Sequence, residues 1–294
     1  MTLSVLIPTC NYTCYSLVEA LHRQLEFCGV DYEIIVAEDG SRDQTSTIAN
    51  HKITKLSHCR HIINSENLGR ARIINSLIRE ARGEWCIIMD SDARVVSHDY
   101  IKKYLLLAND DNDIVVGSLV NPENLPNPEA TLRYKYEKAA EPYRTAEYRS
   151  HHPYERFCTF NLMGRRSALL EVPFDERCTE YGYEDTLMGI EMESRNKRII
   201  HIDNALMHLG FDDNATYLKK VEISLHSLKK IEDKLLPHTG LGKMILQLRK
   251  CHSTYAVKAM YRLFSPLLKR NLLSRNPNLT MFSFYKLGYY LSLS

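Results

Sequence analysis

The 294-residue sequence lacks several patterns that would define its class at once. Its eight cysteines include no Cys-x-x-Cys pair, which argues against a zinc site, and several lie in apolar runs, which favours a reducing compartment. No stretch approaches about 18 uninterrupted apolar residues, so a membrane span is not expected. Residues 1–8 have neither a basic leader nor a long apolar region, and are expected to form a strand rather than a signal peptide.

Common catalytic signatures are missing too. The sequence contains no Gly-x-Gly-x-x-Gly and no phosphate-loop motif, and no Ser or Cys lies in a pattern suited to a nucleophile with its base. Internal repeats and low-complexity segments are also absent. With 44% apolar and 25% charged residues, the composition is that of an ordinary soluble globular protein.

Acidic residues are absent from the last 54 positions. Residues 241–294 contain nine Lys and Arg and no Asp or Glu, whereas the first 240 residues have a net charge of −7. These cations alternate with apolar residues at helical spacing, which indicates either a helical appendage with a basic face or peripheral attachment to an anionic membrane. No nucleic-acid-binding motif accompanies the charge, so nucleic acid is not an expected partner.

Short apolar runs alternate with helical patterns over the first 120 residues. This alternation predicts an α/β fold with a mostly parallel sheet and helices on both faces. Ser41 and Ser97 are the expected N-caps of two of the helices. The runs expected to form strands are 3–7, 33–37, 61–63, 85–89 and 113–120.

Polar clusters directly follow three of these strands, at Pro8–Asn11, Glu38–Ser41 and Asp90–Asp92. Because ligands bind outside the carboxyl ends of parallel strands, we expect the three clusters to form one site. Asp90 and Asp92 would leave the strand end on the same side, about 6–7 Å apart along the backbone. They could then share Mg²⁺ or Mn²⁺, or divide a cation and a hydroxyl-rich ligand between them; the alternative is a solvated turn.

The alternation breaks between residues 121 and 157. This stretch is rich in Pro, Tyr and Arg, and forms either a solvated connection with a short helix or a loop over the cleft. Strands are expected again at 159–163 and 198–203, and a helix that residues 181–186 open and that runs to about residue 195. Helical spacing then continues to the end, which predicts an α/β domain at 1–211 and a helical, basic C-terminal extension at 212–294.

Five motifs occur in an order and spacing that resemble the family 2 glycosyltransferases over residues 3–211. The resemblance implies the GT-A (Rossmann-like) fold, a nucleotide-sugar donor, a divalent metal ion and inversion at the anomeric carbon. The motifs are Val5–Thr9 with Asn11 and Tyr12, Ile35–Ser41, Asn67–Gly69, Asp90–Asp92 and Tyr183–Asp185.

The resemblance also implies roles for individual residues. Asp185 would be the general base, with Glu184 beside it, although acids in a first helical turn are also common dipole complements. Asp92 would be the main metal ligand with Asp90 nearer the ribose, and His208, unless it is structural, would be a further metal or pyrophosphate contact. The implied donor-binding residues are Pro8, Thr9, Asn11, Glu38, Asp39, Arg70, Arg72 and Asp90.

Two positions depart from the family pattern. The family usually begins its first acidic pair with Asp, where this sequence has Glu38, and many members have Arg where this sequence has Ile74. Arg70 or Arg72 could supply the lost cation from a neighbouring turn of the helix.

The predicted activity is metal-dependent transfer of a sugar, with UDP as the expected nucleotide, to a glycan or lipid-linked glycan in cell-surface polysaccharide synthesis. The expected location is cytoplasmic, at the inner face of the plasma membrane if the basic segment binds lipid. A nucleotidyltransferase of related fold would need a Gly-rich basic loop after the first strand, which residues 8–12 lack. A catalytically silent nucleotide-binding protein is the other alternative; both acidic motifs argue against it, and Ile74 keeps it open.

Overall fold

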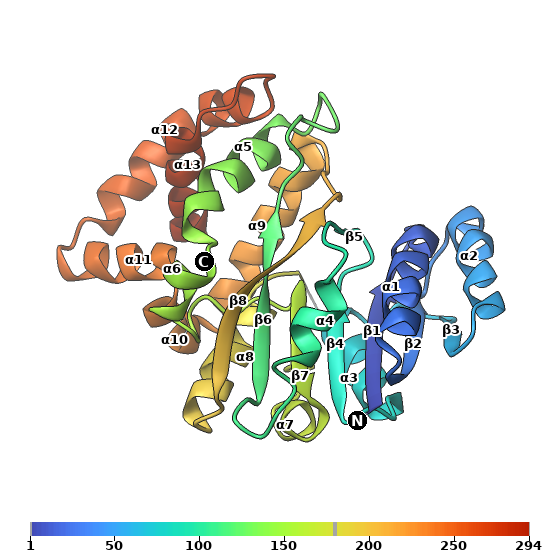
Figure 1. Ribbon diagram of the computed structural model, residues 1–294. Coiled ribbons are helices and arrows are strands. Elements are labelled where there is room, and N and C mark those ends of the chain that lie inside the picture. The colour runs from blue at the N-terminus through green and yellow to red at the C-terminus, as the bar shows by residue number, and fades with distance from the viewer. Residues whose placement is uncertain (1, 179–180, 294) are drawn as a thin grey trace. The chain divides into compact units, whose positions relative to one another are not determined.

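A computed structural model of the chain describes residues 2–178 and 181–293 (Figure 1). The chain divides into two compact units, which are described separately. The first comprises Met1–Val120, Tyr143–Thr179 and Met188–Gly210, and the second comprises Asn121–Pro142, Glu180–Leu187 and Phe211–Ser294. Two earlier segments therefore group with the C-terminal residues, while the domain boundary expected at residue 211 stays a prediction.

The first unit is built on an eight-stranded sheet with the order β3-β2-β1-β4-β7-β6-β8-β5. Four strand pairs are parallel, namely β1–β2, β2–β3, β1–β4 and β6–β8. β7 is antiparallel to both of its neighbours, and β5 is antiparallel to β8. The predicted α/β sheet is confirmed, with these two antiparallel strands added. The strands are β1 (Thr2–Thr9), β2 (Asp31–Asp39), β3 (Cys59–Asn64), β4 (Trp85–Met89), β5 (Ala93–Val95), β6 (Ile114–Val120), β7 (Asn161–Arg165) and β8 (Ile199–His208).

Helices cover both faces of this sheet, which explains why its central strands are almost continuously apolar. Successive side chains of a strand point to opposite faces. Val5 and Ile7 accordingly pack into the core beneath α1 and α4, whereas Leu6 packs into the core beneath α3, α7 and α8. The helices of this unit are α1 (Tyr15–Cys28), α2 (Gln44–His51), α3 (Arg70–Glu80), α4 (Tyr100–Leu105), α6 (Ala146–Ser150) and α7 (Arg166–Glu171), with the 3₁₀ helix η1 (Lys52–Lys55); α8 (Glu184–Ser194) continues into it from the second unit.

Two expected helix caps are wrong. The N-cap of α2 is Asp43, whose carboxylate accepts from the Thr45 amide at 3.0 Å. The Ser41 hydroxyl does not cap the helix; it donates a hydrogen bond to the Glu38 carboxylate instead. The N-cap of α4 is Asp99, and Ser97 donates its hydroxyl to that residue's carboxylate.

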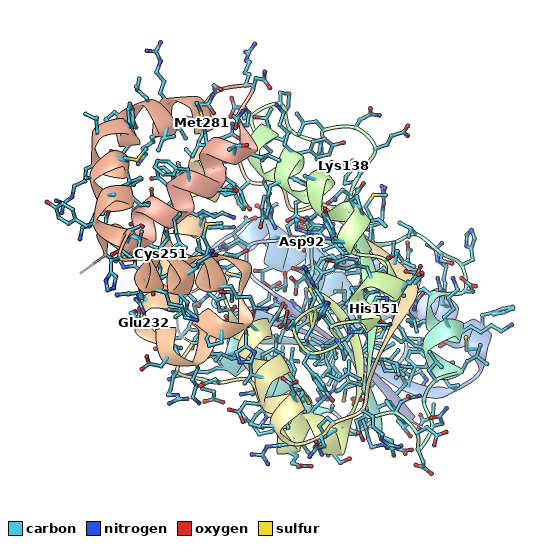
Figure 2. The ribbon with its side chains drawn as sticks, turned by 90° about the vertical axis from the view of Figure 1, so that its left-hand side faces the viewer. Asp92, Lys138, His151, Glu232, Cys251 and Met281 are labelled. Carbon is cyan, nitrogen blue, oxygen red and sulfur yellow. The ribbon has the colours of Figure 1, made fainter. Side chains whose placement is uncertain are left out.

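The second unit is helical, as expected for the C-terminal residues. Figure 2 shows its side chains, with Glu232 of α10, Cys251 just after α11 and Met281 of α13 labelled. Asn214 holds the unit together, since its side chain accepts from the Leu132 amide at 2.7 Å and donates to the Ser274 carbonyl at 2.9 Å. Its helices are α5 (Thr131–Ala140), α9 (Asn214–Lys230), α10 (Glu232–Leu235), α11 (Gly240–Lys250), α12 (Thr254–Leu272) and α13 (Leu279–Ser292), with the 3₁₀ helices η2 (Glu141–Tyr143) and η3 (Leu236–His238).

The segment expected as a connection at 121–157 is about half helical, since it contains α5, η2 and α6. Its proposed position over a cleft stays a prediction. Across residues 2–178 and 181–293, none of the helices has both the length and the apolar character needed to cross a bilayer.

Candidate functional site

Asp90 and Asp92 lie in a turn rather than on an extended strand. β4 ends at Met89, and the Ala93 amide donates to the Asp90 carbonyl oxygen at 3.2 Å. The expectation that strand alternation would direct both carboxylates to one side is therefore wrong, because the strand ends before Asp90 and a turn follows. The two side chains instead have different partners.

Asp90 is paired with Arg70, the first residue of α3. Nη1 of Arg70 lies 2.5 Å from Oδ1 of Asp90, and its Nη2 donates to the Thr159 hydroxyl at 3.0 Å. Both charged side chains are only partly exposed, so their attraction is less screened than on an open surface. The pair places a cation and an anion together at the carboxyl end of β4.

Arg70, rather than Arg72, is thus the cation next to the acidic motif. Arg72 is 52% exposed and lies 3.9 Å from Glu176. Ile74 is fully buried in the core beneath α3, where it is surrounded by apolar side chains. That Arg70 supplies the cation missing at Ile74 stays a prediction.

Asp92 is paired with His208 at the end of β8. The short strand β5 brings them together, because Ala93 pairs with His208 in the antiparallel register of β5 and β8. Oδ2 of Asp92 lies 3.3 Å from Nε2 of His208, and the Asp92 carbonyl accepts from the Leu209 amide at 2.9 Å. A Cβ atom on Gly210 would lie 1.9 Å from Oδ2 of Asp92, so any other residue there would require this carboxylate to move.

The residues present fit a divalent ion that is bound together with substrate. Asp92 and His208 offer one carboxylate and one imidazole, but the described parts of the chain hold no group of three or more His, Cys, Asp and Glu side chains placed to bind a metal. An ion here would need phosphate and water oxygens to complete its shell, as Mg²⁺ and Mn²⁺ commonly do. The expected metal ligands stay a prediction, and Asp90 is ion-paired with Arg70.

Asn11 joins the loops that follow β1 and β2. Its backbone adopts the left-handed conformation with φ of 52°, and its side-chain oxygen accepts from the amides of Arg42 at 2.7 Å and Asp43 at 2.9 Å. Pro8 and Thr9 end β1, and the Thr9 side chain is buried. These expected donor-binding residues therefore lie at the strand edge as predicted, although their contact with a donor stays a prediction.

Glu38 is completely buried at the end of β2. Its carboxylate accepts from Nδ2 of Asn50 at 2.8 Å, lies 3.3 Å from Nε2 of His61, and accepts from the Ser41 hydroxyl. Burial alone would raise the pKa of Glu38, but the hydrogen bonds from His61, Asn50 and Ser41 outweigh it and hold this pKa below its usual value. The buried Glu38 carboxylate thus connects the end of β2 to Ser41, to Asn50 of α2 and to His61 of β3.

Asp39 fixes the loop that leads into α3. Its two carboxylate oxygens accept from the backbone amides of Leu68 at 2.7 Å and Gly69 at 3.0 Å. Arg70 follows directly, so Asp39 helps to set the position from which Arg70 reaches Asp90. This supporting role was not anticipated from the sequence.

Glu184 and Asp185 open α8 in the second unit. Both carboxylate oxygens of Glu184 lie within 3.2 Å of the Gly182 amide, and Tyr183 between them has a left-handed φ of 70°. Glu184 therefore stabilises a tight turn at the helix start. Asp185 is partly exposed in the first turn of α8, and its assignment as general base stays a prediction.

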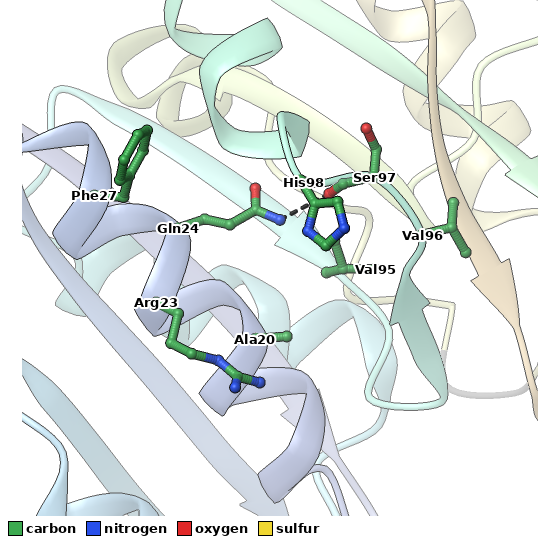
Figure 3. Close-up of a pocket in the computed structure, with 8 residues that line it drawn as sticks. All are labelled: Ala20, Arg23, Gln24, Phe27, Val95, Val96, Ser97 and His98. Atoms are coloured by element: carbon green, nitrogen blue, oxygen red, sulfur yellow. Dashed lines mark hydrogen bonds between the residues drawn. The ribbon is translucent and has the colours of Figure 1, made fainter.

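A cavity of about 590 Å³ lies elsewhere in the first unit, between α1 and residues 95–98 (Figure 3). Gln24 crosses it and donates to the Ser97 carbonyl at 2.7 Å. Phe27, Val95 and Val96 contribute apolar walls, and no acid lines it. None of the candidate donor-binding, metal-binding or catalytic residues lines this cavity, so its size alone does not make it the functional site.

Comparison with known proteins identifies the class. Residues 4–172, more than half of the chain, match the model of the family described as Glycosyl transferase family 2. The chain therefore belongs to glycosyltransferase family 2. Among curated relatives, EpsH of Bacillus subtilis is 36% identical over 84 residues, which are 29% of this chain and 24% of EpsH. The match thus spans about a quarter of that relative's length.

Solved structures show the same fold. The mannosyltransferase PcManGT from Pyrobaculum calidifontis, in complex with GDP-Man and Mn²⁺, aligns with a TM-score of 0.55 and 17% identity, over 98% of this chain and 84% of that one. S. aureus TarS 1-349, in complex with UDP, aligns with a TM-score of 0.53 and 17% identity, over 99% of this chain and 89% of that one. At this identity the likeness establishes the GT-A fold alone.

Proposed function

We propose that this protein transfers a sugar from a nucleoside diphosphate sugar to an acceptor hydroxyl, with inversion and with a bound divalent ion. The observation that carries the proposal is the pair of contacts at the end of β4, Arg70 with Asp90 and Asp92 with His208. The Arg70–Asp90 pair offers a cation and a hydrogen-bond acceptor. The Asp92–His208 pair offers two ligand atoms for a metal ion. These are the groups that a ribose and a diphosphate require.

Each pair has its own task in this proposal. The Asp90 carboxylate accepts hydrogen bonds from the ribose hydroxyls, and Arg70 orients that carboxylate and faces the phosphate charge. Asp92 and His208 would hold Mn²⁺ or Mg²⁺, which would neutralise the charge that develops on the leaving diphosphate. Pro8, Thr9, Asn11 and the loops held by Glu38 and Asp39 would border the base and ribose.

Asp185 would act as the general base. A sugar hydroxyl is a weak nucleophile, so a carboxylate must take its proton as the new glycosidic bond forms. Its position in the first turn of α8, after a turn stabilised by Glu184, supports this assignment. The proton passes to the Asp185 carboxylate, the bond to the diphosphate breaks, and a single displacement inverts the anomeric carbon.

We propose UDP as the nucleotide and a glycan or lipid-linked glycan of a cell-surface polysaccharide as the acceptor. One similar structure contains UDP and another contains GDP-Man, so the fold alone does not select the base. The discriminating experiment is a thermal-shift panel of UDP, GDP, dTDP and CDP, each with and without Mn²⁺, on the wild type and Asp92→Ala. A ligand at 100 times its Kd adds roughly 2.7 kcal/mol to the free energy of unfolding.

One nucleotide should stabilise the wild type only with metal, and Asp92→Ala should abolish that shift. Asp99→Ala, which alters an exposed acid outside the site, is the matched control and should behave like the wild type. If no nucleotide shifts the wild type under any condition, the residues at the end of β4 do not form a donor site and the proposal fails.

We further propose that α12 attaches the protein to an anionic membrane surface, at the inner face of the plasma membrane. Tyr255, Leu263 and Leu267 of this helix are 82%, 73% and 62% exposed. Spacings of four and eight residues place their side chains on one face. The opposite face of the helix carries its buried residues, Tyr261, Leu268 and Leu272. A helix with an exposed apolar face and cations beside it is typical of interfacial membrane binding.

Charge complementarity favours lipid over a protein partner. The helix carries Lys258, Arg262, Lys269 and Arg270, and residues 241–294 contain no acid. Each Lys or Arg near an anionic bilayer contributes on the order of 1 kcal/mol. The whole segment is therefore attracted to a surface of negative charge.

Vesicle co-sedimentation tests this surface. The wild type should sediment with vesicles that contain about one third anionic lipid and remain soluble with neutral vesicles, and the Leu263→Ser/Leu267→Ser variant should lose most of the binding. Phe27→Ser removes a side chain that is 90% exposed on α1 and is the matched control. A wild type that stays in the supernatant with anionic vesicles at low salt would rule out the membrane proposal.

A further inference from the structure

A second cavity of the first unit, with a volume of about 240 Å³, lies beside the Asp90 and Asp92 site. Phe160 separates the two: its carbonyl accepts from the Asp90 amide at 3.4 Å, and its ring meets the His208 ring edge to face at 5.5 Å. The volume suits one substituent or one small ring rather than a whole nucleotide sugar. The cavity is lined by Gly117, Ser118, Leu119, Tyr143, Arg144, Arg149, Glu155, Arg156, Phe157, Cys158, Phe160 and Asn161.

The lining of this cavity is rich in positive charge. Three guanidinium groups, those of Arg144, Arg149 and Arg156, line it together with one carboxylate, that of Glu155. A further carboxylate, Asp203, accepts from the Ser118 hydroxyl at 3.1 Å but is not part of the lining. The excess of cations favours an anionic ligand, because arginine binds phosphate and carboxylate groups through paired hydrogen bonds.

Arg149 is a buried residue of the cavity lining. Among the residues that the structure describes, its guanidinium group forms no hydrogen bond with a carboxylate, so no directly bonded acid neutralises its charge. The side chain is buried, and all five of its acceptors are uncharged. Burial lowers the pKa of His201 to about 4, so that ring is neutral at pH 7 and accepts from Arg149. The acceptors are the carbonyl oxygens of Arg144, Val116 and Ile202, the hydroxyl of Ser118 and Nδ1 of His201.

Aromatic rings pack against two residues of the cavity lining, Arg156 and Tyr143. The Arg156 guanidinium lies over the Tyr148 ring at 5.3 Å, and the Tyr148 ring meets Tyr143 at 5.2 Å. Stacking on a ring restricts a long side chain before any ligand arrives, which lowers the entropy lost on binding. Arg156 and Tyr143 are therefore held in the lining of the cavity, on a segment that Arg149 fixes to β6 and β8.

We propose that this cavity binds an anionic substituent of the acceptor, a phosphate or a carboxylate, through Arg156 and Arg144. This inference rests on the proposed function, since it places the acceptor next to the donor site across Phe160. It also restricts the acceptor class, because a lining with three guanidinium groups and one carboxylate favours an acceptor that carries an anionic group.

Three sugars with the same ring test the proposal: glucose 6-phosphate, glucuronate and glucose. Their Kd values are measured by calorimetry with saturating UDP and Mn²⁺, so that the donor site is already filled. The wild type should bind at least one anionic sugar about tenfold more tightly than glucose. Which anionic sugar is preferred distinguishes phosphate from carboxylate.

Arg156→Ala should reduce the preference to within about twofold, whereas Arg23→Ala, which alters an exposed arginine on α1, should retain it. An unchanged stabilisation by UDP with Mn²⁺ shows that Arg156→Ala is folded. The inference is overturned if the wild type has no anionic preference, or if the preference survives in both Arg156→Ala and Arg156→Glu. If UDP does not bind the wild type at all, the proposed function fails and this inference fails with it.

Discussion

The guanidinium of Arg70 and the carboxylate of Asp90 form an ion pair of 2.5 Å between the start of α3 and the end of β4. Replacing Arg70 by Ala leaves the acid without this cation and adds net negative charge where the diphosphate is expected. We expect the Kd for UDP with Mn²⁺ to rise by about 10- to 100-fold, the range typical of a lost charge-assisted hydrogen bond.

Arg72→Ala is the control for this prediction, because it removes a cation two residues away that is paired with Glu176 instead. Its Kd should stay within about twofold of the wild type. Calorimetric titration of both variants measures the difference. Equal affinities for the wild type and Arg70→Ala would show that the pair plays no part in donor binding.

Gly210→Ala tests the position of Asp92 without changing a proposed ligand. The added Cβ would meet Oδ2 of Asp92 at 1.9 Å, so this carboxylate must leave its present position 3.3 Å from His208. We expect the Mn²⁺-dependent part of nucleotide stabilisation to disappear. Gly240→Ala adds the same methyl group where no atom lies within 4 Å, and should leave the shift intact. A normal metal response in Gly210→Ala would argue that Asp92 does not hold the ion.

Asp185→Asn removes the proposed base but retains the shape of the side chain. General base catalysis contributes about 10²- to 10⁴-fold, so kcat should fall by that factor while the Kd for UDP is nearly unchanged. Glu193→Gln, an exposed acid on the same helix, serves as the control. Steady-state rates together with UDP titrations separate the two effects, and a kcat within about threefold of the wild type would exclude Asp185 as the base.

Glu232 makes the stability of the helical unit depend on pH. The hydrogen bond from the Tyr290 hydroxyl, with those from Arg249 and Lys229, lowers the pKa of Glu232 to about 2 against the effect of burial. Because the folded pKa lies below the ordinary value of about 4.5, the contribution is complete above that pH and is lost as the pH falls towards 2.

Glu232→Gln should therefore lower the free energy of unfolding by about 1–2 kcal/mol at pH 7, a value reduced for solvent screening of a partly exposed group. The difference from the wild type should shrink at pH 3. Asp233→Asn, the exposed neighbour on α10, should change stability little at either pH. Urea denaturation at both pH values provides the measurement, and a destabilisation that is equal at pH 7 and pH 3 would contradict the assignment.

Much of the fold was predictable because its strands follow a simple rule. Residues such as Val5, Leu6 and Ile7 are consecutive apolar side chains, and such runs indicate strands covered on both faces. Polar clusters in the sequence also showed where β1, β2 and β4 end, at the carboxyl edge of the sheet. Local detail was less predictable: Ser41 and Asp43 both suit an N-cap, and the choice between them depends on a bond to Glu38 from another element.

The pairing within the site could not be obtained from the sequence. Asp92 meets His208 only because the three-residue strand β5 pairs with the end of β8, and a strand that short leaves no periodicity to detect. Arg70 could be named beside Arg72, but the choice required the position of Asp90. Gly210 gave one available signal, since a glycine two residues after a candidate ligand suggests that another group approaches the backbone closely.

The contact between Asp92 and His208 also has a consequence for folding. The two residues are 116 positions apart, and His208 lies beyond residue 172, where the match to the family model ends. Contacts between distant residues form late, because closing so long a loop costs entropy that only a nearly complete sheet can recover. During refolding, metal-dependent nucleotide binding should therefore appear after most of the secondary structure, and would report that the last strands have joined the sheet.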